Sequence, residues 1–148
     1  MNKKNSTIVN NVLIKYSALE QSAKLMQTLT CKMKKMSDKC FYDESLIKIK
    51  GNLKYVKWGT DHETLIEKLE DNKMILTYLK VVTESDLSAK TQMLSGKDKK
   101  YGMLKKIGFR KRASQDKTIL GYLEQMQKIN SSIYDAVTYL LPNEAVDQ

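Results

Sequence analysis

Residues that break helices are rare in this chain, and this feature constrains the fold more than any other. Proline occurs once, at Pro142, and glycine six times in 148 residues. Many short strands joined by turns would need far more of both, so the sequence favours a few long helices. The length fits one domain. We predict a single helical domain over residues 1–142 and a frayed tail at residues 143–148.

Residues 6–36 carry the first apolar stripe with helical spacing. Ser6 would cap this helix at its N-terminus, and the pattern breaks at Ser37–Asp43, where we predict a loop. The apolar side chains recur at helical intervals, which places them on one face. They are Ile8, Val12, Leu19, Ala23, Met26 and Met33.

The second stretch, residues 45–59, has two interpretations. Its spacing fits a helix with Ser45 at the cap position and Gly59 at the C-terminus. Ile47 and Ile49 alternate with lysines, so a short strand is the competing interpretation. We favour the helix, because a lone strand would find no partner elsewhere in the chain. The helical positions are Leu46, Ile49, Leu53 and Val56.

The clearest helix start is Thr-Asp-His-Glu at residues 60–63. Thr and Glu three residues apart form a capping box, in which Thr60 accepts from the N3 amide and Glu63 reaches back to the Thr60 amide. We expect Trp58 to be a hydrophobic anchor that closes the preceding loop. Residues 85–94 either continue this helix or form a separate short one. The stripe is Leu65, Leu69, Leu76 and Leu79, with Ile66, Ile75 and Val82 beside it.

The last helix is predicted from near Ser114 to just before Pro142, which cannot continue it. Its apolar positions are Ile119, Leu120, Leu123, Met126, Ile129, Ile133, Val137, Leu140 and Leu141. We expect Met26, Met74 and Met126 in the core. Because four amphipathic helices must bury their stripes against one another, we predict an all-α fold. The expected architecture is an up-and-down four-helix bundle with one or two additional short helices.

Basic residues concentrate between Gly96 and Ala113, in a chain whose formal net charge is +9. We predict that this segment is a mobile, basic surface that binds anions. The apolar residues between its charges suit an anionic lipid surface, through head-group attraction and shallow insertion. A solvated loop that aids solubility and a set of contacts to the nucleic-acid backbone are the other interpretations. The basic residues are Lys97, Lys99, Lys100, Lys105, Lys106, Arg110, Lys111 and Arg112, against one acid, Asp98.

No group of residues in the sequence has the pattern of a catalytic, metal or nucleotide site. The one histidine, His62, falls on the first turn of a predicted helix, where we expect it to be exposed. Cys31 and Cys40 are expected to be reduced and packed. We therefore predict no enzymatic activity, no cofactor and no small-molecule substrate. The first twenty residues fit neither a signal peptide nor a membrane span, so we expect a cytoplasmic location.

The stretch Lys54-Tyr55-Val56-Lys57-Trp58, followed by DHETLIEKL from Asp61, resembles the signature helix of HeLo and HeLo-like domains. That group includes the N-terminal domains of fungal STAND receptors and the four-helix domain of mixed lineage kinase domain-like protein. The resemblance covers about thirty residues around Trp58 to Val82, and the final helix from Gln115 onward has a similar look. It implies a helical bundle that receives an oligomerisation signal and acts at membranes in regulated cell death. Residues 6–30 lack the hydrophobic character of the first helix in the fungal members, so the resemblance does not extend to pore formation.

Our leading hypothesis is a non-enzymatic signalling domain that acts by self-association and by binding to anionic membrane. One alternative is an adaptor that holds another helix in a groove between its own helices. The other is a charge-driven nucleic-acid-binding accessory protein. We rank it lower because lysine dominates the basic residues, whereas base-reading interfaces favour arginine. The expected partners are anionic lipid, a protein partner and a second copy of the chain.

Overall fold

A computed structural model of the chain describes residues 3–36, 40–95 and 102–140. Side chains are described within these ranges except at residues 3–13, 40–41, 103–104 and 139–140. The predicted tail at residues 143–148 lies outside the described ranges.

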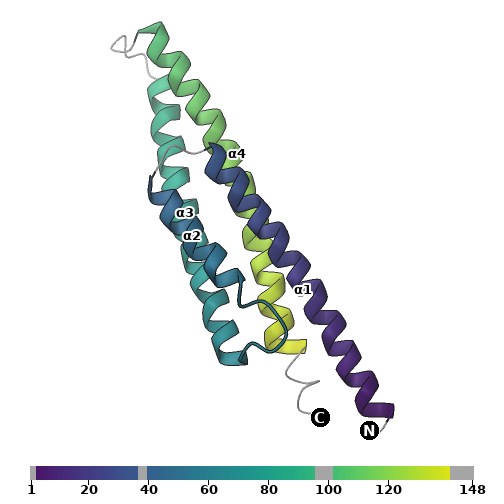
Figure 1. Cartoon of the computed structure of the whole chain (residues 1–148). Coiled ribbons are helices and arrows are strands. Elements are labelled where there is room, and N and C mark those ends of the chain that lie inside the picture. The colour runs from purple at the N-terminus through teal and green to yellow at the C-terminus, as the bar shows by residue number, and fades with distance from the viewer. Residues whose placement is uncertain (1–2, 37–39, 96–101, 141–148) are drawn as a thin grey trace.

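Within these ranges the chain forms four helices and no strand (Figure 1), which confirms the predicted all-α bundle. The helices are α1 Lys3–Met36, α2 Cys40–Leu53, α3 His62–Ser95 and α4 Met103–Asp135, and α4 runs into a π-helical turn, η1 Ala136–Leu140. Both α1 and α3 pack against α2 and α4. This neighbour order is that of an up-and-down bundle. The strand interpretation of residues 45–59 is wrong, because α2 is helical through Leu53.

The core is built mainly from the apolar stripes that the sequence predicts, and Tyr16, Leu29 and Tyr42 add to it. Its buried members include Leu19, Ala23, Met26 and Met33 of α1, Leu46, Ile49 and Leu53 of α2, Leu65, Leu69, Leu76 and Leu79 of α3, and Ile119, Leu123, Met126 and Ile133 of α4. Two predicted core residues are exposed. Met74 has 72% of its surface accessible, because it lies on the side of α3 opposite the leucine stripe. Cys31 is a free, exposed thiol.

The first two helices begin earlier than predicted. α1 begins at Lys3 and α2 at Cys40, so Ser6 and Ser45 lie inside helices and cap neither. Burial of Tyr42 accounts for the early start of α2, because the ring is enclosed and its hydroxyl bonds to Thr83 of α3. Gly59 ends no helix. It lies in the α2–α3 connection with φ 91°, in the left-handed region that glycine adopts readily.

The capping box predicted on Thr60 and Glu63 does not form. Asp61 is the N-cap of α3, since its carboxylate accepts the Thr64 amide at 3.2 Å and its carbonyl accepts the Leu65 amide at 2.9 Å. The Thr60 hydroxyl is buried with no hydrogen-bond partner among the described residues. A carboxylate competes well for this position, because it accepts strongly and carries the charge that a helix N-terminus favours.

The basic segment is the largest departure from the predicted fold. α3 continues to Ser95, so residues 85–94 extend it, and α4 begins at Met103 rather than near Ser114. The resulting α3–α4 hairpin projects beyond the end of α1 and the start of α2 (Figure 1). Ala113 and Asp116 are buried on the inner side of this extension. Residues 103–113 are therefore helical and not a loop.

Candidate functional site

The outer end of the α3–α4 hairpin carries part of the predicted basic segment on a regular helix. Lys105, Arg110, Lys111 and Arg112 are exposed on the first turns of α4, and Lys106 is partly buried. None of the five forms an ion pair with another described residue. Lys97, Lys99 and Lys100 lie outside the described residues. We call Lys105, Lys106, Arg110, Lys111 and Arg112 the basic end.

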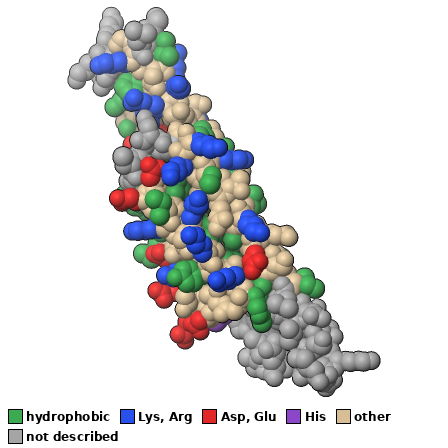
Figure 2. All heavy atoms as spheres, viewed as in Figure 1, with side chains coloured by type: hydrophobic (Ala, Val, Ile, Leu, Met, Phe, Trp, Pro, Cys, Tyr) green, Lys and Arg blue, Asp and Glu red, His purple; other side chains and the backbone are tan. Residues whose placement is uncertain are grey.

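The basic end also presents an apolar side chain to solvent. Ile107 has 53% of its surface accessible. Arg110 and Lys111 follow it by three and four residues, so all three share one face of α4. Lys and Arg side chains cover the visible face from the end of the hairpin down over the bundle, and most visible Asp and Glu side chains lie along one edge (Figure 2). An exposed isoleucine flanked by cations suits shallow insertion between anionic head groups.

A buried polar cluster fixes the hairpin where it leaves the bundle. The Lys90 ammonium on α3 lies 2.7 Å from the Asp116 carboxylate on α4. Nearby, Thr83 donates to the Leu79 carbonyl at 2.7 Å, so its oxygen is left to accept from the Tyr42 hydroxyl. Burial raises the pKa of the Tyr42 phenol; the bond with Thr83 opposes this, and the Asp116 charge adds to it. The ion pair holds α4 against α3, and the Tyr42–Thr83 bond holds α2 against α3.

The α2–α3 connection contains the other predicted site residues. The Trp58 ring meets the Tyr16 ring of α1 edge to face, with centroids 5.3 Å apart. This contact ties the connection to α1, although the indole stays half exposed. Glu63 and His62 are exposed on the first turn of α3.

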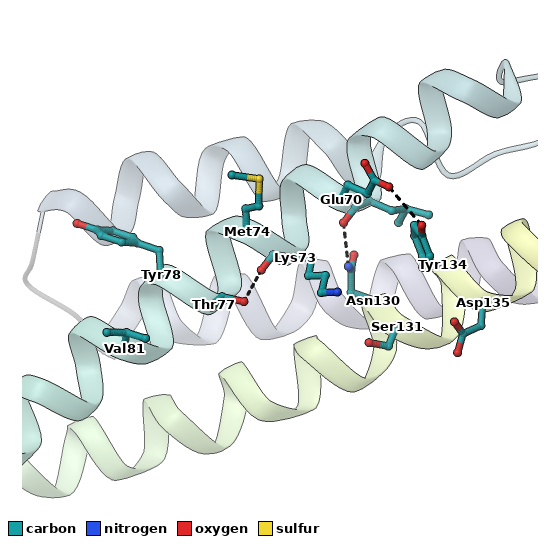
Figure 3. Close-up of a pocket in the computed structure, with 11 residues that line it drawn as sticks. Glu70, Lys73, Met74, Thr77, Tyr78, Val81, Asn130, Ser131, Tyr134 and Asp135 are labelled. Atoms are coloured by element: carbon teal, nitrogen blue, oxygen red, sulfur yellow. Dashed lines mark hydrogen bonds between the residues drawn. The ribbon is translucent and has the colours of Figure 1, made fainter.

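The structure shows a second surface that we did not predict, an open groove between α3 and α4 (Figure 3). Its volume is about 810 Å³, and one wall is formed by Met74, Tyr78 and Val81 of α3. Their spacing of four and three residues could have identified them, because it marks a second apolar stripe on the face of α3 opposite the core.

The floor of the groove is polar. Asn130 of α4 is buried and donates through Nδ2 to the Leu69 carbonyl at 3.0 Å. Its Oδ1 has no hydrogen-bond partner among the described residues. Next to it the Tyr134 hydroxyl donates to Glu70 at 3.2 Å, which closes one end of the groove (Figure 3). The groove thus has an apolar wall beside a buried amide whose oxygen has no partner among the described residues.

The described residues offer no candidate site of two other kinds. No group of three or more His, Cys, Asp or Glu side chains among them is arranged to hold a metal ion. No described helix combines the length and the apolar character needed to cross a membrane.

No family model, no curated protein and no solved structure matches this chain.

Proposed function

We propose that the chain is a non-enzymatic signalling domain that binds anionic membrane through its basic end and acts by self-association. One observation supports binding to anionic membrane. Five cations, none paired with a carboxylate of a described residue, lie on the outer turns of a helical hairpin that projects beyond the bundle, with Ile107 exposed among them. A projecting end can reach a flat surface that the sides of a bundle would meet less closely.

The magnitudes support this proposal. Each cation near an anionic leaflet contributes about 1 kcal/mol. Four engaged cations would therefore give a dissociation constant in the millimolar range on charge alone, since about 4 kcal/mol corresponds to about 1 mM. Insertion of Ile107 and association of two copies would each strengthen this. Binding that needs several weak contributions is reversible, which suits a signalling domain recruited from the cytoplasm. The resemblance to HeLo-like domains suggests regulated cell death as the setting.

Vesicle sedimentation tests the proposal, with phosphatidylcholine vesicles compared with vesicles that also contain phosphatidylserine. Changing Lys105, Arg110, Lys111 and Arg112 together to Gln should lower affinity for the anionic vesicles at least tenfold. The matched control changes Lys24, Lys48, Lys54 and Lys57 to Gln, which removes the same charge from exposed positions elsewhere. Ile107→Ser should lower affinity severalfold with the charge unchanged. Equal binding to neutral vesicles, or equal losses in the two four-residue variants, would refute the membrane contact.

The groove favours a second function, that of an adaptor. An open groove with an apolar wall between two long helices is the surface that an amphipathic helix of another protein would occupy. Nucleic-acid binding is less well supported, because the cations of the basic end surround one helix instead of lining a channel. A short DNA duplex added to the vesicle assay distinguishes it. Duplex binding as tight as vesicle binding, lost in the same variant, would favour nucleic acid over lipid.

A further inference from the structure

We propose that the α3–α4 face containing the groove is the surface through which two copies of this chain associate, with α3 antiparallel to α3 of the second copy. The inference rests on the self-association in the proposed function and assigns its surface. It does not depend on lipid, because the groove and the basic end lie on different parts of the hairpin.

The first argument is the exposed apolar stripe. Met74, Tyr78 and Val81 have 72%, 55% and 59% of their surfaces accessible. They follow one another along the outer face of α3, while the opposite face of the same turns is enclosed in the core. A continuous stripe of this kind, beside a groove, marks a surface that a partner covers. Single exposed residues such as Ile47 on α2 form no such stripe.

The second argument identifies the occupant as a second copy, through charge. Lys73 lines the groove, and the spacing of about three turns places Glu84 on the same side of α3 beyond it. An antiparallel pairing centred near Tyr78 brings Lys73 of one copy close to Glu84 of the other, twice by symmetry. The same pairing sets Met74 against Val81 of the second copy. On α4 it brings Glu124 near Lys128 of the second copy.

The parallel alternative lacks this complementarity. It would set Glu70 against Glu70 of the second copy, Lys73 against Lys73 and Glu84 against Glu84. Like charges placed opposite each other disfavour association. The surface is therefore self-complementary in the antiparallel sense only.

Light scattering during size exclusion, across a range of protein concentrations and without lipid, tests the inference. The wild-type chain should form dimers, and Met74→Glu should shift the dissociation constant at least tenfold. Ile47→Glu is the matched control, because it places the same charge at an exposed apolar residue away from the groove. Circular dichroism confirms that both variants remain folded.

A charge exchange tests the antiparallel register. Lys73→Glu alone and Glu84→Lys alone should each weaken the dimer, because each sets like charges close together. The double variant, with both substitutions in every copy, should return the dissociation constant to within about threefold of the wild-type value. The exchange restores opposite charges at positions 73 and 84 across the interface, with their signs reversed.

A wild-type chain that stays monomeric at every accessible concentration would overturn the inference. So would a dimer that Met74→Glu leaves intact, or single charge variants that the double variant fails to rescue. Failure of vesicle binding with an intact dimer refutes only the membrane contact. Vesicle binding by a chain that does not dimerise refutes this surface and the self-association, and leaves the membrane contact intact.

Discussion

The Lys90 ammonium lies 2.7 Å from the Asp116 carboxylate, and this ion pair joins α3 to α4. Both side chains are largely enclosed, with 15% and 4% of their surfaces accessible. A carboxylate at this depth is stabilised by the nearby ammonium, because burial of a charge is costly unless an opposite charge lies close to it. The pair therefore stabilises the packing of α4 against α3 just after the basic end.

Lys90→Met should lower the free energy of unfolding by about 3 kcal/mol, since Asp116 would remain buried without its cation. Replacing both residues, Lys90→Met with Asp116→Leu, should return the stability to within about 1 kcal/mol of the parent, because neither charge is then desolvated. Urea denaturation followed by circular dichroism measures both. A single variant as stable as the parent would show that the pair is solvated in solution.

Tyr42 should make the fold sensitive to alkali. Its pKa is raised in the folded chain, chiefly by burial. Above a pH of about 10 the unfolded chain loses the phenol proton while the folded chain keeps it, so stability falls as pH rises through this range. Tyr16 contributes in the same direction, because burial raises its pKa too.

Tyr42→Phe should therefore show a smaller loss of stability than the parent as pH rises from neutral to above about 10. At neutral pH the same variant should be less stable by about 1 kcal/mol, because the bond to Thr83 is lost. Tyr55→Phe, at an exposed tyrosine outside the groove, is the control. An unchanged alkaline profile in Tyr42→Phe would contradict the role of this phenol.

The sequence was sufficient to predict the helices and most of the core, because burial follows the periodicity of apolar residues. It was not sufficient at the start of α4. In that segment the many charged residues mask the periodicity of the buried positions. These positions include Ala113 and an acid, Asp116. An acid at an inward position is recognised only once its partner is known, and Lys90 lies on another helix. Met74 was misassigned because apolar character alone does not distinguish the two faces of α3.

The basic end could be found from the sequence, since charge density needs no tertiary information. The groove could not, because it depends on how far α3 and α4 separate on their open side and on which atoms line the gap. The polar contacts between helices were also missed. Asn52, Asn72 and Asn130 occur at buried helical positions where a stripe would have an apolar residue.

A buried amide pair should make α2 and α3 depend on each other. Asn52 on α2 donates through Nδ2 to Asn72 at 2.8 Å and to Asp71 at 2.9 Å, both on α3. Asn52→Leu should cost about 2 kcal/mol, because Asn72 is fully enclosed and would lose its donor. The double variant with Asn72→Leu should recover most of this loss. Thermal unfolding measures the stability lost in the single and in the double variant. Equal losses in both would mean that packing, and not the amide contact, accounts for the cost.

The N-cap of α3 is Asp61 in the structure, whereas the sequence suggested Thr60. Asp61→Ala should lower the free energy of unfolding by about 1 kcal/mol, because the Thr64 amide would lose its acceptor and the helix N-terminus a favourable charge. Thr60→Val should be neutral or slightly stabilising, because the hydroxyl that it removes is buried without a partner among the described residues. Urea denaturation at neutral pH measures both variants. If Thr60→Val were the more destabilising variant, Thr60 and not Asp61 would be the N-cap, as the capping box requires.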